Sequence, residues 1–422
     1  MRPQVDPSSV RNRYILVSLL WCVAALAVKP FFPYLDFAAF YATGIDKILS
    51  GTPLDLYAFV ARPPHSDLAN PLAHPPIWFF CLSPWYALGK LLHLDDFHNQ
   101  SGMSYGQAWM LFVTLPLDLL LCRTIVRIAE SGRRFAEPQR FVLFLCILLS
   151  PLLWLSSVRF QHNEAAMILC VLLAIAAGEK NRPGWSGLLW GLALGLKTTA
   201  VVPALVYFGW GLGRERRRST ALAGVVAACV FLVPLLPYLS LRREQITYAL
   251  FGFERIRPVG GYVVWKLFAG GATLAAYGNA LILLVSAGLG IVLARRPGAS
   301  FLASGGAWAL VLSQVALLLF GKAVYVWYAL AVSCFLFLAD ARDGPRGRTI
   351  PVVPLLATCA LWACQQADWV GADVSPAILL RSGAWALLLL GIGAVAVRGW
   401  MAGSLPPLQP APGVSRSSPT AA

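Results

Sequence analysis

Apolar stretches separated by short polar connections run through the whole chain. About 20 apolar residues cross the hydrocarbon core of a membrane as a helix. On that basis we expect spans at about residues 14–33, 105–126, 140–157, 163–178, 219–240, 271–294, 301–321, 323–340, 349–364 and 378–397. The pattern predicts an all-α polytopic membrane protein.

Two further apolar segments do not fit a single crossing. Segment 74–88 is short and contains Pro84, so we expect a short or re-entrant helix. Segment 184–212 is interrupted by Lys197. One crossing there would leave the basic cluster 214–218 on the outer side. We favour two half-helices with Lys197 at the turn, because discontinuous helices are tolerated where they line a cavity.

Basic residues indicate how the spans are oriented. Cytoplasmic loops of membrane proteins carry an excess of Lys and Arg, so the N-terminal residues 1–13, with Arg2, Arg11 and Arg13, are expected inside. The same rule places most other basic connections inside. The loops 34–73 and 241–270, together with the turn 157–164, are then external.

Composition agrees with a membrane protein. The 422 residues are 58% hydrophobic and 13% charged, whereas a soluble domain carries roughly 25% charged residues. Net charge is +15, from 34 Lys and Arg against 19 Asp and Glu, but the basic residues lie in short loops, so no nucleic acid partner is expected. The nine cysteines form no CxxC pair, and we expect neither a metal site nor a cofactor. The tail 401–422, rich in Pro, Ser and Ala, is expected to be disordered.

An amphipathic pattern follows the end of the first span. Phe37, Phe40, Tyr41, Ile45 and Ile48 recur at helical spacing, and Ser50–Pro53 supplies a stop. Such a helix is expected to lie in the membrane interface with its apolar face down. Asp36 would then be held at the bilayer surface as a general base, or it would cap the helix, and both roles can hold together.

Ionisable and polar residues gather on the predicted outer side. The candidate site residues there are Asp36, His74, Arg159, Gln161, Asn163, Lys197, Arg255, Lys266, Lys322 and Tyr325. Cations could stabilise a leaving phosphate, and Lys197 is the strongest candidate because a cation within an apolar stretch is costly.

Each candidate also has a plainer interpretation. Lys197 could snorkel to the interface, and Arg255 could be a solvated loop charge. Lys322 and Tyr325 fit an aromatic interface belt. His74 could simply begin a helix, while Gln161 and Asn163 could either bind sugar hydroxyls or satisfy a turn.

Several short motifs occur in a recognisable order. They are Asp36-Phe37 with Phe40-Tyr41, Leu49–Pro53 with Leu56-Tyr57, His74-Pro75-Pro76, Gln161-x-Asn163, and Gly191–Lys197. In this order the chain resembles the polyprenol-phosphate-mannose-dependent mannosyltransferases of glycosyltransferase family 87, which have the GT-C fold. The resemblance covers about residues 14–340. His74 stands where the family has Tyr, and loop 241–270 lacks the family's Asn-Gln-Ser element.

The resemblance implies a GT-C-type helical bundle over residues 14–400 and an inverting glycosyltransferase. Its donor would be a polyprenyl-phosphate hexose, specifically mannose, and its acceptor a lipid-linked or glycan hydroxyl. Asp36 matches the family's catalytic acidic position. The resemblance further implies an integral protein of a bacterial plasma membrane, surrounded by membrane lipids, with its active site facing outward.

Two other readings remain open from the sequence. A polytopic transporter or lipid flippase should place ionisable residues near the bilayer midplane, whereas here they gather near the outer ends of the spans. A GT-C enzyme that uses a different sugar is the second alternative, because sugar identity depends on pocket contacts.

Overall fold

A computed structural model describes residues 7–32, 41–57, 75–99, 103–133, 135–247, 260–261, 264–268, 271–275, 277–321, 323–324, 326–343, 351–363 and 376–402. The expected disordered tail lies outside these residues from position 403 onward. So do Asp36, His74, Arg255, Lys322 and Tyr325.

Helices make up nearly all of the described chain. They are α1 (Pro7–Val28), α2 (Thr43–Leu49), α3 (Pro76–Leu91), α4 (Tyr105–Trp109), α5 (Leu111–Gly132), α6 (Glu137–Leu148), α7 (Pro151–Leu153), α8 (Glu164–Glu179), α9 (Pro183–Leu196), α10 (Val201–Leu212), α11 (Arg217–Leu232), α12 (Leu236–Leu241), α13 (Arg243–Thr247), α14 (Gly271–Ala275), α15 (Gly278–Ala294), α16 (Gly306–Phe320), α17 (Ala329–Asp343), α18 (Val352–Ala363) and α19 (Pro376–Ala402). The described strands β1 (Gly260–Gly261) and β2 (Ala323–Val324) pair in parallel.

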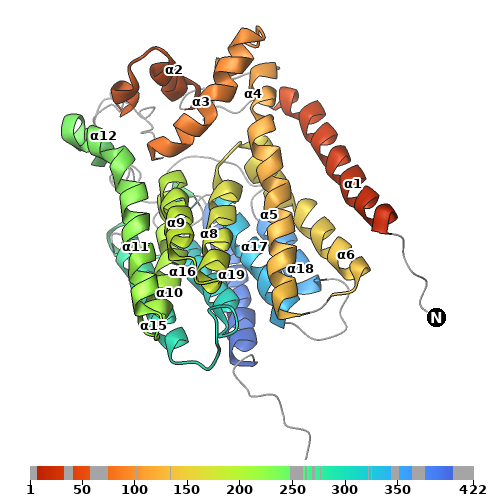
Figure 1. Cartoon of the computed structure of the whole chain (residues 1–422), viewed down its shortest axis with the longest axis vertical. Coiled ribbons are helices and arrows are strands. Elements are labelled where there is room, and N and C mark those ends of the chain that lie inside the picture. Colours follow the sequence, from red (N-terminus) through yellow and green to blue (C-terminus); the bar gives the residue numbers. More distant parts are fainter. Residues whose placement is uncertain are drawn as a thin grey trace, which may run out of the picture.

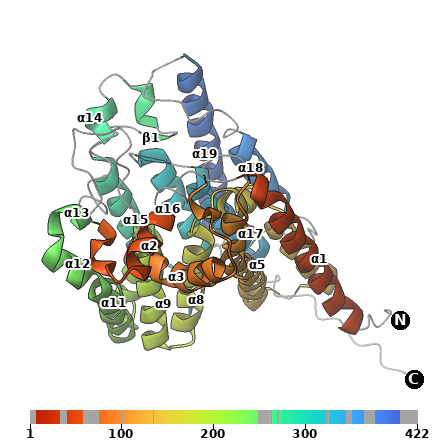
Figure 2. The same cartoon turned by 90° about the horizontal axis from the view of Figure 1, so that it is seen from above.

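The long helices stand side by side in a bundle. Neighbouring pairs are α8 with α9, α9 with α11, α10 with α15, and α16 with both α17 and α19 (Figure 1). A layer containing α2 and α3 covers one end, and α1 runs along the flank (Figures 1 and 2). The stretches long and apolar enough to cross a membrane are Val10–Phe31, Tyr105–Gly132, Glu137–Arg159, Arg217–Leu241 and Ser382–Ala402, within the part of the chain that the structure describes. The protein is an all-α polytopic membrane protein.

Basic connections meet at the end of the bundle opposite the α2–α3 layer. Arg214 hydrogen-bonds the carbonyl of Arg296, and Arg296 donates to the carbonyl of Trp400 at 2.7 Å. The C-terminal end of α5 lies at the same end of the bundle (Figure 1), where Gly132 packs against the side chain of Arg342. We name this the basic end, and we name the opposite end, where α8 begins, the Lys197 end.

The predicted break within 184–212 is confirmed. Helix α9 ends at Leu196, Lys197 has extended backbone (φ −154°, ψ 129°), and α10 begins at Val201. The ring of Trp190 lies 5.5 Å from that of Tyr207, so α10 runs back along α9. The chain therefore returns to the basic end, as the position of the cluster 214–218 led us to expect.

Glycines allow α9 to lie close against α11. A Cβ at Gly191 would lie 2.5 Å from the Cβ of Val230, which is nearer than two carbon atoms can approach. This packing supports the half-helix α9 along its length. It thereby fixes the position of Lys197 at the helix end.

The segment predicted to be short or re-entrant is α3. It has 16 residues, includes Pro84, and lies obliquely across the Lys197 end (Figure 1). The hydroxyl of Ser83 donates to the carbonyl of Phe79 at 2.7 Å, just before the proline. Helix α3 packs on α2 and α9.

Two expectations need correction. The apolar side of residues 41–49, which include α2, is covered by protein: Tyr41 and Ile45 are buried, and Tyr41 packs on Phe79 of α3 with ring centroids 5.6 Å apart. The predicted span 323–340 begins later, at Ala329, because β2 and a 3-10 turn (Val326–Tyr328) occupy its first residues.

Candidate functional site

A tight turn connects the end of one helix to the start of α8. The chain forms a π-helical turn at Trp154–Arg159 and then folds back, so the amide of His162 donates to the carbonyl of Ser156 at 2.9 Å. Gln161 has φ +51°, a left-handed conformation that non-glycine residues adopt at an energetic cost. Such strained turns cluster at functional sites. We name residues 159–164 the outer turn.

Lys197 forms an ion pair with Glu164 of the outer turn. Their side chains are 5% and 1% exposed, respectively. The Lys197 ammonium also lies 4.3 Å from the ring centroid of Tyr328, within range of a cation–π contact. Lys197 is therefore buried and does not snorkel. The break between α9 and α10 places the charge of Lys197 opposite Glu164, the first residue of α8.

The two amide residues of the outer turn use their donors on the protein backbone. Asn163 Nδ2 donates to the carbonyl of Leu196, and Gln161 Nε2 donates to the carbonyl of Gln107. Within the described ranges, Gln161 Oε1, Asn163 Oδ1 and Glu164 Oε2 are buried and have no hydrogen-bond partner. Buried acceptors normally have partners. Three open acceptors in one turn suit a ligand that carries hydroxyl donors.

Aromatic rings cover the outer turn. The indole of Trp327 stacks on His162 with centroids 4.0 Å apart and planes 23° apart, and Phe160 lies 5.2 Å from the same indole. Trp327 is 4% exposed, so it does not belong to a lipid-facing belt. It follows β2, whose pairing with β1 brings the second predicted external loop beside this segment.

One residue at this site, Lys29, was not predicted from the sequence. Its side chain is fully buried at the end of α1, and its Nζ donates to the carbonyl of Arg159 at 2.9 Å. Arg159 itself is exposed, with its guanidinium 5.3 Å from the ring of Phe160. Lys29 could have been noticed as a cation closing an apolar span on the side where such loops are poor in Lys and Arg.

The structure thus brings together four of the predicted residues, Arg159, Gln161, Asn163 and Lys197. To these it adds Lys29, His162, Glu164, Trp327 and Tyr328. Asp36, His74, Arg255, Lys322 and Tyr325 lie outside the described residues. Lys266 falls in a described 3-10 turn (Val264–Leu267), but its side chain is outside the description.

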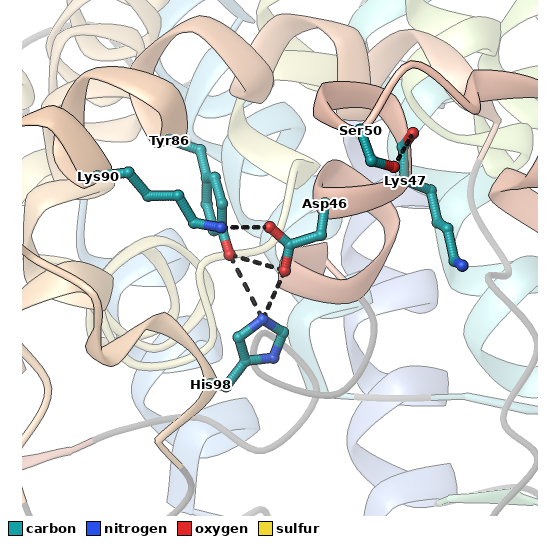
Figure 3. Close-up of polar contacts among 6 residues, drawn as sticks. All are labelled: Asp46, Lys47, Ser50, Tyr86, Lys90 and His98. Atoms are coloured by element: carbon teal, nitrogen blue, oxygen red, sulfur yellow. Dashed lines mark hydrogen bonds and ion pairs between the residues drawn. The ribbon is translucent and has the colours of Figure 1, made fainter.

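A separate polar cluster holds α2 in place. Asp46 Oδ1 lies 2.7 Å from Lys90 Nζ, and Asp46 Oδ2 lies 2.7 Å from His98 Nε2 and accepts from the Tyr86 hydroxyl at 3.2 Å (Figure 3). Burial alone would raise the pKa of Asp46, but the hydrogen bonds from Lys90 and His98 outweigh it and lower that pKa. The cluster connects α2 to the last turn of α3 and the 3-10 turn Asp96–His98. It therefore fixes the segment that follows Asp36 in the chain.

The described part of the chain offers no set of protein ligands for a metal ion. No group of three or more His, Cys, Asp or Glu side chains there is placed to hold an ion. Around the outer turn, the described charged groups are the Lys197–Glu164 ion pair and the cations Lys29 and Arg159.

The fold is that of a polytopic membrane protein with interrupted helices and a buried polar turn at one end, and the family comparison gives its class. The family model described as glycosyltransferase family 87 matches residues 73–300, more than half of the chain. The chain belongs to glycosyltransferase family 87 and is a membrane glycosyltransferase. The match includes the outer turn and the α9–α10 hairpin. A search of curated proteins gives no match.

Proposed function

We propose that this protein transfers a hexose, specifically mannose, from a polyprenyl-phosphate donor to a hydroxyl of a lipid-linked or glycan acceptor, on a GT-C-type scaffold. The observation that carries the proposal is the convergence at the Lys197 end. The outer turn, which carries Arg159, Gln161 and Asn163, meets Lys197 of the distant α9–α10 break beside the stacked pair of Trp327 and His162. Family membership supports the sugar-transfer chemistry.

The reaction needs a base and an anion site. Asp36 is the proposed base: its carboxylate takes the proton of the acceptor hydroxyl as that oxygen attacks the anomeric carbon. The bond between the anomeric carbon and the phosphate oxygen breaks, and the phosphate leaves with the electron pair. Because attack and departure occur on opposite faces, the sugar's configuration inverts. Cations near the phosphate stabilise the charge that develops on it.

The outer turn is the proposed sugar site. Gln161 Oε1 and Asn163 Oδ1 are buried acceptors that can receive hydrogen bonds from sugar hydroxyls. Lys197 and Glu164 hold the turn against the α9–α10 break, so both amides are positioned by rigid helices. His74, Arg255, Lys266, Lys322 and Tyr325 remain proposed substrate contacts.

The proposed setting is a bacterial plasma membrane, with the Lys197 end facing outward and the basic end facing the cytoplasm. The separation of charge in the fold supports this orientation. Arg214 contacts Arg296, and Arg342 lies against Gly132 at the C-terminal end of α5, on the same end of the bundle; basic loops stay inside.

The test is a transfer assay with purified protein reconstituted in lipid vesicles. Mannose, glucose and pentose esters of a polyprenyl phosphate are supplied in turn, with a mixture of membrane glycolipids as acceptors. We expect transfer from the mannose donor and little or none from the glucose and pentose donors. Preferred transfer of another sugar would refute the mannose assignment, and movement of the donor lipid across the vesicle without transfer would refute the enzyme proposal.

A further inference from the structure

The ammonium of Lys29 is buried, and no acid among the described residues accompanies it. Its side chain is fully buried and its Nζ donates to a backbone carbonyl, that of Arg159. Over the described part of the chain, no carboxylate lies within ion-pair distance of it. A charge removed from water is costly unless an opposite charge accompanies it.

Arg159 places a second positive charge near that ammonium. Lys29 Nζ is hydrogen-bonded to the Arg159 carbonyl, and like charges in one site disfavour each other. Arg159 likewise has no acidic partner among the residues that the structure describes. Lys197 differs in this respect, because Glu164 already balances its charge. Within the described residues, Lys29 and Arg159 are thus neighbouring cations that no carboxylate balances.

The surroundings indicate which anion. The outer turn, with the open acceptors of Gln161 and Asn163, begins at Arg159, so an anion on Lys29 and Arg159 would lie beside the proposed sugar site. A phosphate offers several oxygens that accept charge-assisted hydrogen bonds from ammonium and guanidinium groups.

The flank of α1 indicates what the anion is attached to. Leu16, Leu19, Leu20 and Val23 of α1 are 58–63% exposed, and Phe31 beyond Lys29 is 58% exposed. Helix α1 stands at the edge of the bundle (Figure 2). An apolar surface of a membrane helix that leads directly to a buried cation suits a molecule with a hydrocarbon chain and a phosphate head.

We propose that Lys29 and Arg159 bind the phosphate of an isoprenoid phosphate lipid whose chain lies along the exposed face of α1. The site rests on the proposed function and deepens it. It assigns the donor's phosphate to these two cations, while Lys197 and Glu164 hold the outer turn in shape.

Binding to the full-length protein in lipid nanodiscs tests the site. The probes are farnesyl phosphate, the neutral alcohol farnesol and inorganic phosphate. We expect wild-type protein to bind farnesyl phosphate at least tenfold more tightly than either of the others. Lys29→Met and Arg159→Met should each reduce this preference about tenfold, and Lys29→Arg should retain most of it. Lys180→Met, at an exposed lysine near the basic end, is the matched control.

The outcomes separate the possible roles. An unchanged preference in Lys29→Met and Arg159→Met would overturn the phosphate site. Equal binding of inorganic phosphate and farnesyl phosphate would overturn the lipid part of the proposal. Because Met fills nearly the same space without a charge, Lys29→Met should unfold at a temperature no lower than wild type. A loss of folding with Lys29→Met but normal farnesyl phosphate binding by Arg159→Met would make Lys29 structural and overturn the paired site.

Failure of the proposed function has a different signature. If wild-type protein transfers no sugar yet retains a Lys29-dependent preference for farnesyl phosphate, the phosphate site stands and the transferase proposal fails. If transfer proceeds and both methionine variants bind farnesyl phosphate normally, the transferase proposal stands and the phosphate site fails.

Discussion

Removing the carboxylate of Glu164 should leave the Lys197 ammonium buried and unpaired. The two side chains are 5% (Lys197) and 1% (Glu164) exposed, so solvent does not screen the pair. Breaking a buried ion pair by removing one partner costs about 3–5 kcal/mol, whereas replacing both partners with apolar residues is often neutral. We therefore expect Glu164→Leu and Lys197→Met each to lower the free energy of unfolding by about 3–5 kcal/mol. The double variant should recover most of that loss.

Equilibrium unfolding in mixed micelles, titrated with a denaturing detergent, measures these free energies. The ion pair between Arg242 and Asp55 is the matched control, because both of its side chains are 39% exposed. Solvated pairs contribute about 0–1 kcal/mol, so Asp55→Asn should change stability by no more than that. Additive losses in the Glu164→Leu, Lys197→Met double variant would refute the reasoning, since they would mean that the two charges do not compensate each other.

Two further predictions concern groups outside the proposed site. Asp118 is fully buried and its Oδ1 accepts from the Ser157 hydroxyl at 2.7 Å. Asp118→Asn keeps an acceptor there and should be tolerated, while Asp118→Leu should lose about 1–3 kcal/mol of unfolding free energy. Equal losses in the two variants would contradict this prediction. The pKa of Asp46 is lowered in the folded state, so its stabilisation is present above the ordinary Asp pKa of about 3.9 and is lost as pH falls through the lower folded value. Unfolding midpoints measured across that window should fall steeply for wild type and less steeply for Asp46→Asn; parallel curves would show that the Asp46 cluster does not hold α2.

Much of the fold follows from patterns that are local in the sequence. Long apolar runs mark the spans, and a lysine within an apolar stretch marks the break between α9 and α10, because a cation cannot continue into hydrocarbon without a partner. The positions of the arginines indicate that the chain must return after that break. Each of these inferences uses neighbouring residues only.

The contacts of the site depend on residues far apart in the chain. Lys197 and Glu164 are separated by 33 positions, and Lys29 lies 130 positions from Arg159. Neither pairing can be obtained from spacing, because it requires knowing which helix ends meet. The same applies to α2: its apolar pattern fits an interfacial helix equally well, and only the position of α3 shows that protein covers that face.

Transfer of labelled mannose by the Asp36→Asn variant, in lipid vesicles supplied with polyprenyl-phosphate mannose, tests the central claim most directly. Asp95→Asn, at an exposed carboxylate near the end of α3, serves as the control. We predict that Asp36→Asn inserts and unfolds like wild type but transfers no mannose, while Asp95→Asn transfers it at the wild-type rate. Full transfer by Asp36→Asn would contradict the account.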